Sequence, residues 1–224
     1  MNRLTLCAAA LAATALGAPA LARAEDGRWQ IKLLGSGVLP DGRIDAVTTD
    51  LIGLPAGSQT RADDNVVPTM AIEFYATPNL SIETICCLTQ HKVDGAGALA
   101  DARIVDHVLI LPATLTLKYH VDAGPIRPYV GLGPSLFVIM GEKPGATAKA
   151  LGASRVTMSN ELGLVLQGGV DIPVGDGGLG ISFDAKKYFV DTTARFTTTA
   201  GVKALETRHK LDPWVISGGV YFSF

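Results

Sequence analysis

The amino-acid sequence predicts an all-β protein, an eight-stranded antiparallel up-and-down β-barrel that crosses a membrane. Three observations predict this fold. Eight segments alternate apolar with polar or small residues, the period that sends side chains to opposite faces of a strand. The connections between these segments are alternately short and long. The last segment ends the chain on its apolar face, at Phe224.

The N-terminus is typical of a secretory signal peptide. Arg3 precedes an apolar run over residues 4–16, and small residues lead to the sequence Ala22-Arg23-Ala24. A cation, an apolar stretch and an A-x-A pattern in this order mark a signal peptide that is removed on export. We therefore expect a signal peptide over residues 1–24 and one barrel domain over residues 25–224.

The composition limits the class of protein. Removing Arg3 and Arg23 from the 19 basic residues leaves 17 against 21 acidic residues, a net charge of −4, which argues against a nucleic-acid partner. The chain is 48% hydrophobic with a mean hydropathy of +0.30. Beyond the first segment, however, no apolar run approaches the roughly 20 residues of a transmembrane helix. The hydrophobicity is therefore distributed along strands.

Four strands are expected in the N-terminal half of the chain, over residues 28–38, 67–77, 80–91 and 109–120. Their apolar faces carry Trp29, Ile31 and Leu33; Met70, Ile72 and Phe74; Leu80 and Ile82; and Leu109, Leu111, Leu115, Leu117 and Tyr119. The opposite faces include the charged residues Lys32, Glu73, Glu83 and Lys118. Cys86 and Cys87 are adjacent and lie on opposite faces, so their spacing predicts small strand residues rather than a disulfide framework.

Four more strands are expected over residues 126–138, 162–171, 181–189 and 214–224. Their apolar faces carry Ile126, Val130, Leu132, Leu136 and Val138; Leu162, Leu164, Leu166 and Val170; Ile181, Phe183, Ala185 and Phe189; and Trp214, Ile216, Val220, Phe222 and Phe224. The opposite faces include Arg127, Asp171, Asp184 and Lys186. Glycines within these strands allow the curvature that a closed barrel needs.

The connections also predict the topology. Those over residues 78–79, 122–125 and 174–178 are short, and those over residues 39–65, 92–107, 141–159 and 190–212 are long. In an up-and-down barrel this alternation puts all long loops at one rim, with both termini at the rim of tight turns. Bacterial outer-membrane barrels have this arrangement, with short turns in the periplasm.

Two soluble folds also alternate apolar with polar residues, a lipocalin-like barrel and a β-sandwich. Strands of ten or more residues and a chain that ends in phenylalanine favour a barrel of the bacterial outer membrane. Outer-membrane lipids are then its surroundings. The barrel-assembly machinery is an expected partner, with Phe224, Phe222 and Val220 as the signal that it reads.

The ordered set of motifs resembles the OmpW family of small outer-membrane barrels. It comprises Leu111-Pro112-Ala113-Thr114-Leu115 with Tyr119-His120; Arg127-Pro128-Tyr129-Val130-Gly131-Leu132-Gly133; Gly168-Gly169-Val170-Asp171; Asp184-Ala185-Lys186-Lys187-Tyr188; and Asp212-Pro213-Trp214 with Gly218-Gly219-Val220 and Phe224. The resemblance covers nearly all of residues 25–224. It implies an eight-stranded barrel whose narrow, partly apolar lumen is associated with uptake of small hydrophobic molecules across the outer membrane.

Motifs for other chemistry are weak. Residues 175–180 match G-x-G-x-x-G, but period-two alternation resumes at Ile181, which predicts a hairpin turn instead of a phosphate loop. Asp106-His107, His120 and His209 are candidates for a hydrolase or acyltransferase site, but no G-x-S-x-G motif accompanies them. We expect no enzyme activity, no cofactor and no metal; a lipid-modifying barrel enzyme is the third alternative.

We expect a passive channel for small hydrophobic molecules. The inward positions include a candidate apolar path of Leu34, Ile85, Ile110, Tyr129, Phe137 and Val165. Buried charges need partners, so Glu83, Lys118, Arg127 and Asp171 are expected to form a polar plug at the periplasmic rim.

Proline cannot donate to the hydrogen-bond ladder. Gaps near Pro68, Pro112 or Pro128 are therefore candidates for a lateral exit, through which an apolar solute would enter the bilayer. The alternative places these prolines at ordinary strand ends or bulges. The rival function is a structural or surface-recognition barrel with a plugged lumen.

Overall fold

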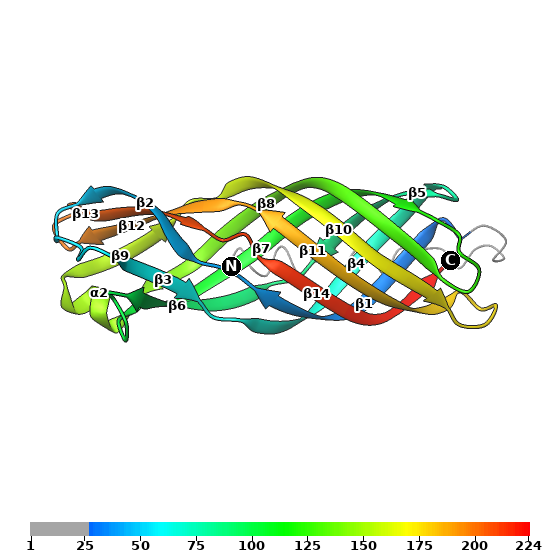
Figure 1. Ribbon diagram of the computed structural model, residues 1–224, viewed down its shortest axis with the longest axis horizontal. Coiled ribbons are helices and arrows are strands. Elements are labelled where there is room, and N and C mark those ends of the chain that lie inside the picture. The colour runs from blue at the N-terminus through cyan, green and yellow to red at the C-terminus, as the bar shows by residue number, and fades with distance from the viewer. Residues whose placement is uncertain (1–26) are drawn as a thin grey trace, which may run out of the picture.

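The structure is a computed structural model that describes residues 27–224. The expected signal peptide, residues 1–24, lies outside the described residues. Eight strands form a closed antiparallel barrel (Figure 1). They are β1 (Trp29–Leu39), β4 (Asn65–Thr77), β5 (Leu80–Cys86), β7 (Arg103–His120), β8 (Arg127–Pro144), β10 (Glu161–Pro173), β11 (Leu179–Phe189) and β14 (Trp214–Ser223). Each pairs with the next, and β14 pairs with β1. The predicted fold class is confirmed.

The three tight turns and the C-terminus lie at one end of the barrel (Figure 1). Trp29 and Phe224 tie the two ends of the barrel wall together there, through backbone hydrogen bonds of 3.1 and 2.9 Å. The turn over residues 174–178 closes with a bond from Val174 N to Leu179 O, 2.8 Å. Gly175 and Gly178 take φ values of +67° and +76° in this turn, which glycine adopts without strain. The hairpin predicted from residues 175–180 is therefore present.

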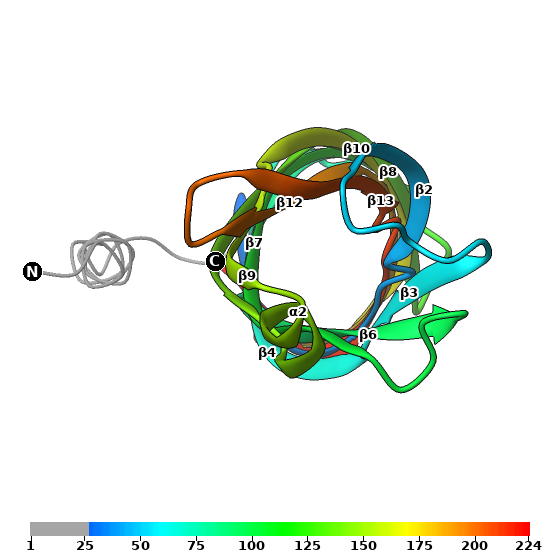
Figure 2. The same ribbon diagram turned by 90° about the vertical axis from the view of Figure 1, so that its left-hand side faces the viewer.

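The long connections, which the sequence predicts as loops, are mostly strand. They contain β2 (Arg43–Asp50), β3 (Ser58–Ala62), β6 (Thr89–Gly97), β9 (Ala153–Met158), β12 (Asp191–Thr198) and β13 (Lys203–Lys210), with the short helix α2 (Ala146–Ala150). β2, β13, β12 and β9 form a separate four-stranded sheet, and β3 and β6 extend the barrel sheet beside β7. Seen from the end that carries the long connections, these strands and α2 form a ring that continues the barrel wall (Figure 2). No helix among the described residues is long and apolar enough to cross a bilayer.

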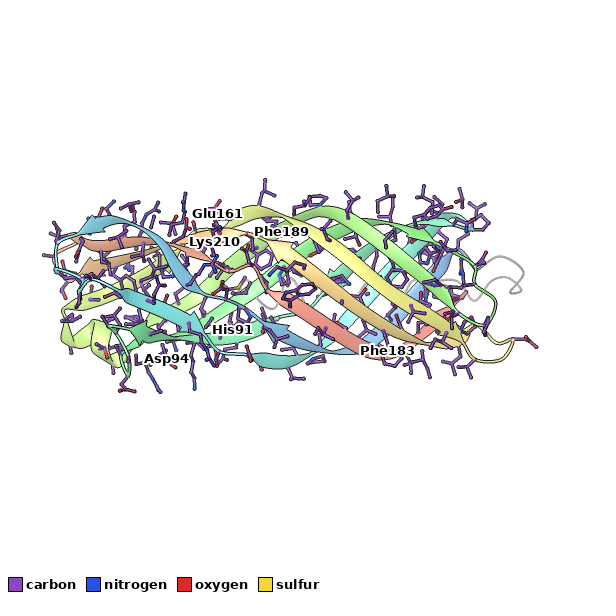
Figure 3. All side chains as sticks on the ribbon, viewed as in Figure 1. His91, Asp94, Glu161, Phe183, Phe189 and Lys210 are labelled. Atoms are coloured by element: carbon purple, nitrogen blue, oxygen red, sulfur yellow. The ribbon has the colours of Figure 1, made fainter. Side chains whose placement is uncertain are left out.

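The two faces of the wall have opposite characters. Leu164 and Phe183 are 46% and 52% exposed on the outside, and Phe183 and Phe189 project outward from β11 (Figure 3). Lys32 and Lys118, by contrast, are at most 1% exposed, on the inside. An apolar outside with charges buried inside is the inverse of a soluble barrel. This decides against both soluble alternatives.

Candidate functional site

A cluster of buried charges fills the lumen in the half of the barrel nearer the tight turns. Its members, here called the plug, are Lys32, Glu73, Glu83, Lys118, Asp171, Asp184 and Lys186. Lys118 Nζ lies 2.8 Å from Glu73 Oε2 and 2.9 Å from Glu83 Oε2. Lys32 Nζ lies 2.9 Å from Asp171 Oδ1, and Lys186 Nζ lies 2.6 Å from Asp184 Oδ1. Each buried charge therefore has an opposite charge within contact distance, as burial requires.

Neutral side chains connect the ion pairs of the plug. Gln167 donates to Glu83 Oε1 and Asp184 Oδ2, at 2.9 and 2.7 Å. Tyr129 donates from its hydroxyl to Asp184, 2.9 Å, and the centre of its ring lies 3.7 Å from Lys118 Nζ. His120 Nε2 lies 2.9 Å from Glu73 Oε1. The cross-section at this level is filled by a connected polar network.

The structure places three of the four predicted plug residues in this network, namely Glu83, Lys118 and Asp171. Arg127 is a correction: it bonds Asp122 Oδ1 at 2.8 Å and Pro78 O at 2.7 Å, at the rim. As the first residue of β8, it directs its long side chain out toward the tight turns, where these partners lie. Tyr129, predicted in the apolar path, is a second correction because it lies within the plug.

A small apolar cavity, here called the lumen chamber, lies next to the plug on the side of the long connections. Its lining residues are Val38, Pro40, Cys87, Thr89, His91, Ile110, Pro112, Phe137, Tyr188, Leu211, Pro213 and Val215. Along β11, Tyr188 lines the chamber, and the next two inward residues toward the tight turns, Lys186 and Asp184, belong to the plug. The chamber therefore ends where the buried charges begin.

Members of the predicted apolar path lie in or near this chamber. Ile110 and Phe137 line it directly. Ile85 and Val165 belong to the same buried apolar cluster as these two residues. Leu34 is buried on the lumen side of β1 but does not line the chamber.

The barrel wall has a break beside the lumen chamber, at Cys87 and Leu88. The ladder between β4 and β5 ends at Met70 and Cys86, and the ladder between β6 and β7 begins at Thr89 and Ile110. Cys87 and Leu88 belong to neither strand. We call this segment the wall gap. It interrupts the strand that was predicted as continuous over residues 80–91.

Two of the three candidate exit prolines flank the wall gap. Pro68 faces outward on β4, beyond the end of its ladder with β5, and Pro112 on β7 lines the lumen chamber together with Cys87. Pro128 is a correction, because it lies near the tight turns, opposite Val170 and accepting a hydrogen bond from Val121 N. Pro68 therefore lies at the ladder break on the outer face, and Pro112 lies at it on the side of the chamber.

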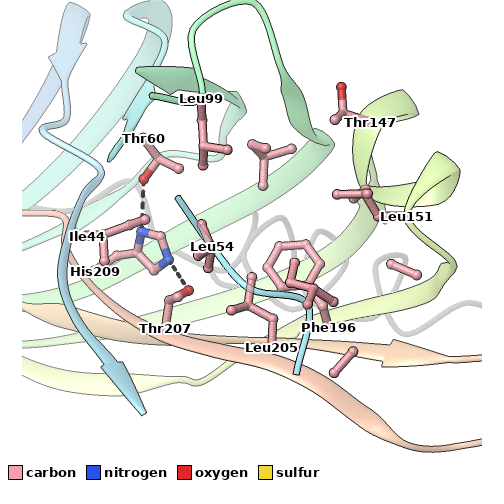
Figure 4. Close-up of a pocket in the computed structure, with 15 residues that line it drawn as sticks. Ile44, Leu54, Thr60, Leu99, Thr147, Leu151, Phe196, Leu205, Thr207 and His209 are labelled. Carbon is pink, nitrogen blue, oxygen red and sulfur yellow. Dashed lines mark hydrogen bonds between the residues drawn. The ribbon is translucent and has the colours of Figure 1, made fainter. Parts of the chain in front are cut away.

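A second apolar cavity, here called the vestibule, lies at the end of the long connections (Figure 4). It holds about 660 Å³ of free space, part of it open to solvent. Its lining residues are Ile44, Ile52, Leu54, Thr60, Leu99, Ile104, Thr147, Ala148, Leu151, Ala153, Phe196, Ala204, Leu205, Thr207 and His209. They come from six strands, from α2 and from loops, so no single stretch of sequence marks the cavity.

The residues weighed for other chemistry do not converge. His120 lies in the plug, His209 in the vestibule, and His107 on β7 beside Gly141. Within residues 27–224, no group of three or more histidine, cysteine or acidic side chains is arranged to hold a metal ion. The proposed assembly signal lies on the outer face of β14 and the residue after it. There Val220, Phe222 and Phe224 are about half exposed, and the two phenylalanine rings stack at 6.0 Å.

Comparison with known proteins assigns the family. The model of the OmpW family matches residues 25–224. This chain belongs to the OmpW family. It is 33% identical to outer-membrane protein y4mB of Sinorhizobium fredii, over 95% of this chain and 90% of the relative. It is 25% identical to outer membrane protein W of Escherichia coli, over the full length of both chains.

Solved structures agree with the fold of this OmpW-family chain. The crystal structure of OprG from Pseudomonas aeruginosa superposes with a TM-score of 0.74 at 22% identity, covering 88% of this chain and 95% of OprG. The structure of AlkL in lipid bilayers gives 0.70 at 21% identity, covering 93% and 95%. The protein is therefore a bacterial outer-membrane barrel. In such barrels the tight turns face the periplasm and the long loops face the outside.

Proposed function

We propose that this barrel is a passive channel through which small hydrophobic molecules pass from the extracellular side into the outer membrane. A solute enters at the extracellular end, occupies the lumen chamber, and leaves sideways through the wall gap into the bilayer. One observation carries the proposal: Cys87 and Pro112 border the wall gap and also line the apolar chamber. The uptake that the family resemblance implies supports it.

The plug supports a sideways exit. A solute that continued straight toward the periplasm would have to displace Lys118 from two carboxylates at 2.8 and 2.9 Å. Removing one partner from a buried ion pair costs about 3 to 5 kcal/mol. An apolar solute forms no ion pair or hydrogen bond that would compensate for this loss. Exit into lipid, by contrast, keeps the solute in apolar surroundings throughout.

The rival function is a structural or surface-recognition barrel with a plugged lumen, and the plug itself favours it. The lumen chamber favours transport, because a purely structural barrel has no need of an apolar cavity behind a ladder break. Uptake measurements separate the two.

The test narrows the wall gap by Ala113→Trp. Ala113 faces outward on β7, next to Pro112. The matched control is Ala185→Trp, which also faces lipid but is paired on both sides, with Gly168 and Ile216. Uptake of naphthalene by cells, and ion conductance in planar bilayers, are measured for each folded barrel.

We expect Ala113→Trp to lower naphthalene uptake and Ala185→Trp to leave it unchanged, with low conductance in all forms. Equal uptake by Ala113→Trp would remove the side exit. High conductance of the unmodified barrel would contradict the plug. Equal uptake by cells with and without the protein would favour the rival function.

A further inference from the structure

The barrel wall continues into the ring in two different ways. β7 and β8 run into it without interruption, each over 18 residues. Four neighbouring barrel strands, β1, β14, β11 and β10, are instead interrupted before they continue, in the same lateral order, as β2, β13, β12 and β9. We call this four-stranded sheet the flap. The rest of the ring, formed by β3, β6, α2 and the outer parts of β7 and β8, is the fixed half; β2, β13 and β12 lie along one side of the ring, and β6 and α2 along the other (Figure 2).

The four interruptions form a line across the wall, here called the hinge line. They cover residues 40–42, 211–213, 190 and 159–160. Backbone hydrogen bonds join the first three sideways, from Asp41 N to Leu211 O at 2.9 Å and from Leu211 N to Val190 O at 3.1 Å. Ser159, in the fourth, bonds Thr193 at 3.0 Å. Because the interruptions are neighbours, the wall can bend along them without losing these lateral bonds.

The backbone along the hinge line departs from a regular strand. Pro40 and Pro213 have no N–H to donate to a ladder. Gly42 and Asp212 take φ values of +76° and +31°, outside the extended region. Short connections at the ends of strands are the usual place of hinges in proteins that move by domain closure. The sequence of these connections therefore suits a bend at this level.

A groove on the outer surface follows the hinge line. Leu162 and Phe189 line it on the side of the barrel, and Asp191 and Lys210 line it on the side of the flap. Phe189 and Lys210 mark its two sides in Figure 3. The groove leaves space into which the flap can tilt outward.

The flap is held together internally. Its four strands pair with one another from β2 to β9. On the outer face Arg208 pairs with Asp45, and Arg195 pairs with Glu206. All these contacts lie within the flap, so a tilt about the hinge line leaves them intact and the sheet moves as one body.

Two seams join the flap to the fixed half, and side chains hold both. Among residues 27–224 no backbone ladder joins the two sheets. At the first seam, Gln59 of β3 accepts from Ile44 N of β2 at 3.0 Å and donates to Ile44 O at 3.2 Å. At the second, Glu142 of β8 accepts from Met158 N of β9 at 2.8 Å. Such bonds break by rotation of one side chain, without separating paired strands.

Buried contacts also cross the first seam, close to the hinge line. Thr60 Oγ1 donates to Gly42 O at 2.6 Å and lies 3.2 Å from His209 Nδ1 (Figure 4). Gly42 belongs to the hinge line, and His209 lies two residues from it. A tilt displaces the flap least at this level, so these contacts can persist while the outer part of the seam separates.

We propose that the flap is a gate that tilts about the hinge line and opens the vestibule when the bonds of Gln59 and Glu142 break. The vestibule lies between the two parts, since Phe196 and Leu205 line it from the flap and Ile104 lines it from the fixed half. As an entry gate for solutes the flap rests on the proposed function, whereas its motion does not.

Opening is tested by the rate at which a water-soluble methanethiosulfonate reacts with a single cysteine inside the ring. The full barrel is used in lipid nanodiscs, with Cys86 and Cys87 replaced by alanine. Val156→Cys is the probe, because Val156 on β9 is 2% exposed, and Thr157→Cys, at the next and exposed position, is the reference. The rate at the buried position follows the population of the open flap. We expect it to be lower than the rate at the reference.

Releasing the first seam should raise the open population. Gln59→Leu removes both bonds to Ile44 at the opposite edge of the flap from β9, and Gln90→Leu, at an exposed position of the fixed half, is its matched control. One net hydrogen bond shifts an equilibrium about two- to tenfold. We therefore expect Gln59→Leu to accelerate labelling of Val156→Cys by at least about twofold and to leave Thr157→Cys unchanged. An unchanged rate in the folded Gln59→Leu barrel would overturn the proposal.

The second seam supplies an independent variant should Gln59→Leu fail to fold. Glu142→Leu releases Met158 N, and the exposed Lys143→Leu is its control. The probe then moves to Ile44→Cys in β2, at the edge of the flap away from the released bond. Faster labelling there in Glu142→Leu alone supports motion of the whole flap, and equal rates in both variants contradict it.

The labelling experiments do not involve transport, so their outcome is separate from that of the uptake test. Accelerated labelling together with equal naphthalene uptake by cells with and without the protein would retain the flap and remove the proposed function. Unchanged labelling together with uptake that depends on the protein would remove the flap and retain the channel.

Discussion

Replacing Lys118 by methionine should strongly destabilise the folded barrel. The Lys118 side chain is fully buried, and its ammonium contacts Glu73 and Glu83 at 2.8 and 2.9 Å. Methionine has a similar length and volume, so the cavity stays filled while the charge is lost. The removal leaves buried carboxylates with fewer cations, a change that costs about 3 to 5 kcal/mol in proteins.

The lysines that remain near Glu73 and Glu83 place the loss of stability from the broken ion pairs near the lower end of that range. Lys32 Nζ still lies 3.2 Å from Glu73, and Lys186 Nζ lies 3.1 Å from Glu83, so neither acid is left without a cation. The lost contact with the ring of Tyr129 adds up to about 2 kcal/mol in a desolvated site. Together the two contributions give an expected loss of about 3 to 5 kcal/mol in the free energy of unfolding.

The plug also predicts a partial rescue. Three lysines face four carboxylates in the plug, and Lys118→Met leaves two lysines against four. Adding Glu83→Gln removes one carboxylate and returns the cluster to its original difference of one. We expect the double variant to recover at least half of the lost stability.

Unfolding and refolding in urea, with the barrel in lipid vesicles and Trp29 and Trp214 as fluorescent reporters, measure these values. Lys143→Met is the control, because Lys143 is exposed on β8 and surface substitutions usually change stability by at most about 0.5 kcal/mol. A Lys118→Met barrel that folds with stability within about 1 kcal/mol of the unmodified protein would refute the ionic account of the plug. A double variant less stable than Lys118→Met would refute the argument from charge balance.

Three further predictions concern the faces, assembly and pH. Leu164→Arg should cost about 2 to 4 kcal/mol in the same titration because it faces lipid, whereas Gln167→Arg should cost less because Gln167 already contacts two acids; equal losses would mean that the faces are inverted. Deleting Phe224 should lower the yield of heat-modifiable folded barrel, and an unchanged yield would count against an assembly signal there. The pKa of His209 is lower in the folded protein than its ordinary 6.5. Its contribution to stability is therefore complete above pH 6.5 and declines as the pH falls below that value, where the unfolded chain takes up the proton first. The protection factors of the β13 amides, which are exchange rates corrected for the intrinsic pH dependence, should fall on acidification, and His209→Gln should remove that fall.

The barrel was predictable from sequence because lipid makes the outward positions uniformly apolar. Leu164, Leu166 and Phe183 alternate with residues of the opposite character, and this contrast marks strands within the bilayer. Beyond the bilayer the outward positions are polar, as at Thr193 and Arg195. The strands there have no apolar outer face, so the pattern that marks the strands of the barrel is missing. The sequence of β2, β9, β12 and β13 therefore does not distinguish these strands from loops.

Depth along the barrel axis was harder to predict than the choice of face. Alternation assigns Arg127 and Tyr129 to the same face of β8, but it says nothing about which residues of that face share a level along the axis. That depends on the stagger between neighbouring strands and on side-chain length. The vestibule posed the same problem in a stronger form, because Ile44, Phe196 and Leu205 meet only through the pairing of β2, β13 and β12.

The wall gap is energetically unfavourable in a membrane barrel, and its position beside the lumen chamber agrees with the proposed exit. In lipid an unpaired backbone group costs several kcal/mol, so barrels normally keep every ladder closed. Here Asn65 Nδ2 donates to Gln90 O at 2.8 Å at the outer edge of the gap, which replaces a ladder bond by a side chain. The break at Cys87 and Leu88 falls beside the apolar chamber and not beside the plug, where water and ions would gain access to lipid. A ladder break beside the lumen chamber exposes none of the plug charges, and this is the position that the proposed lateral exit requires.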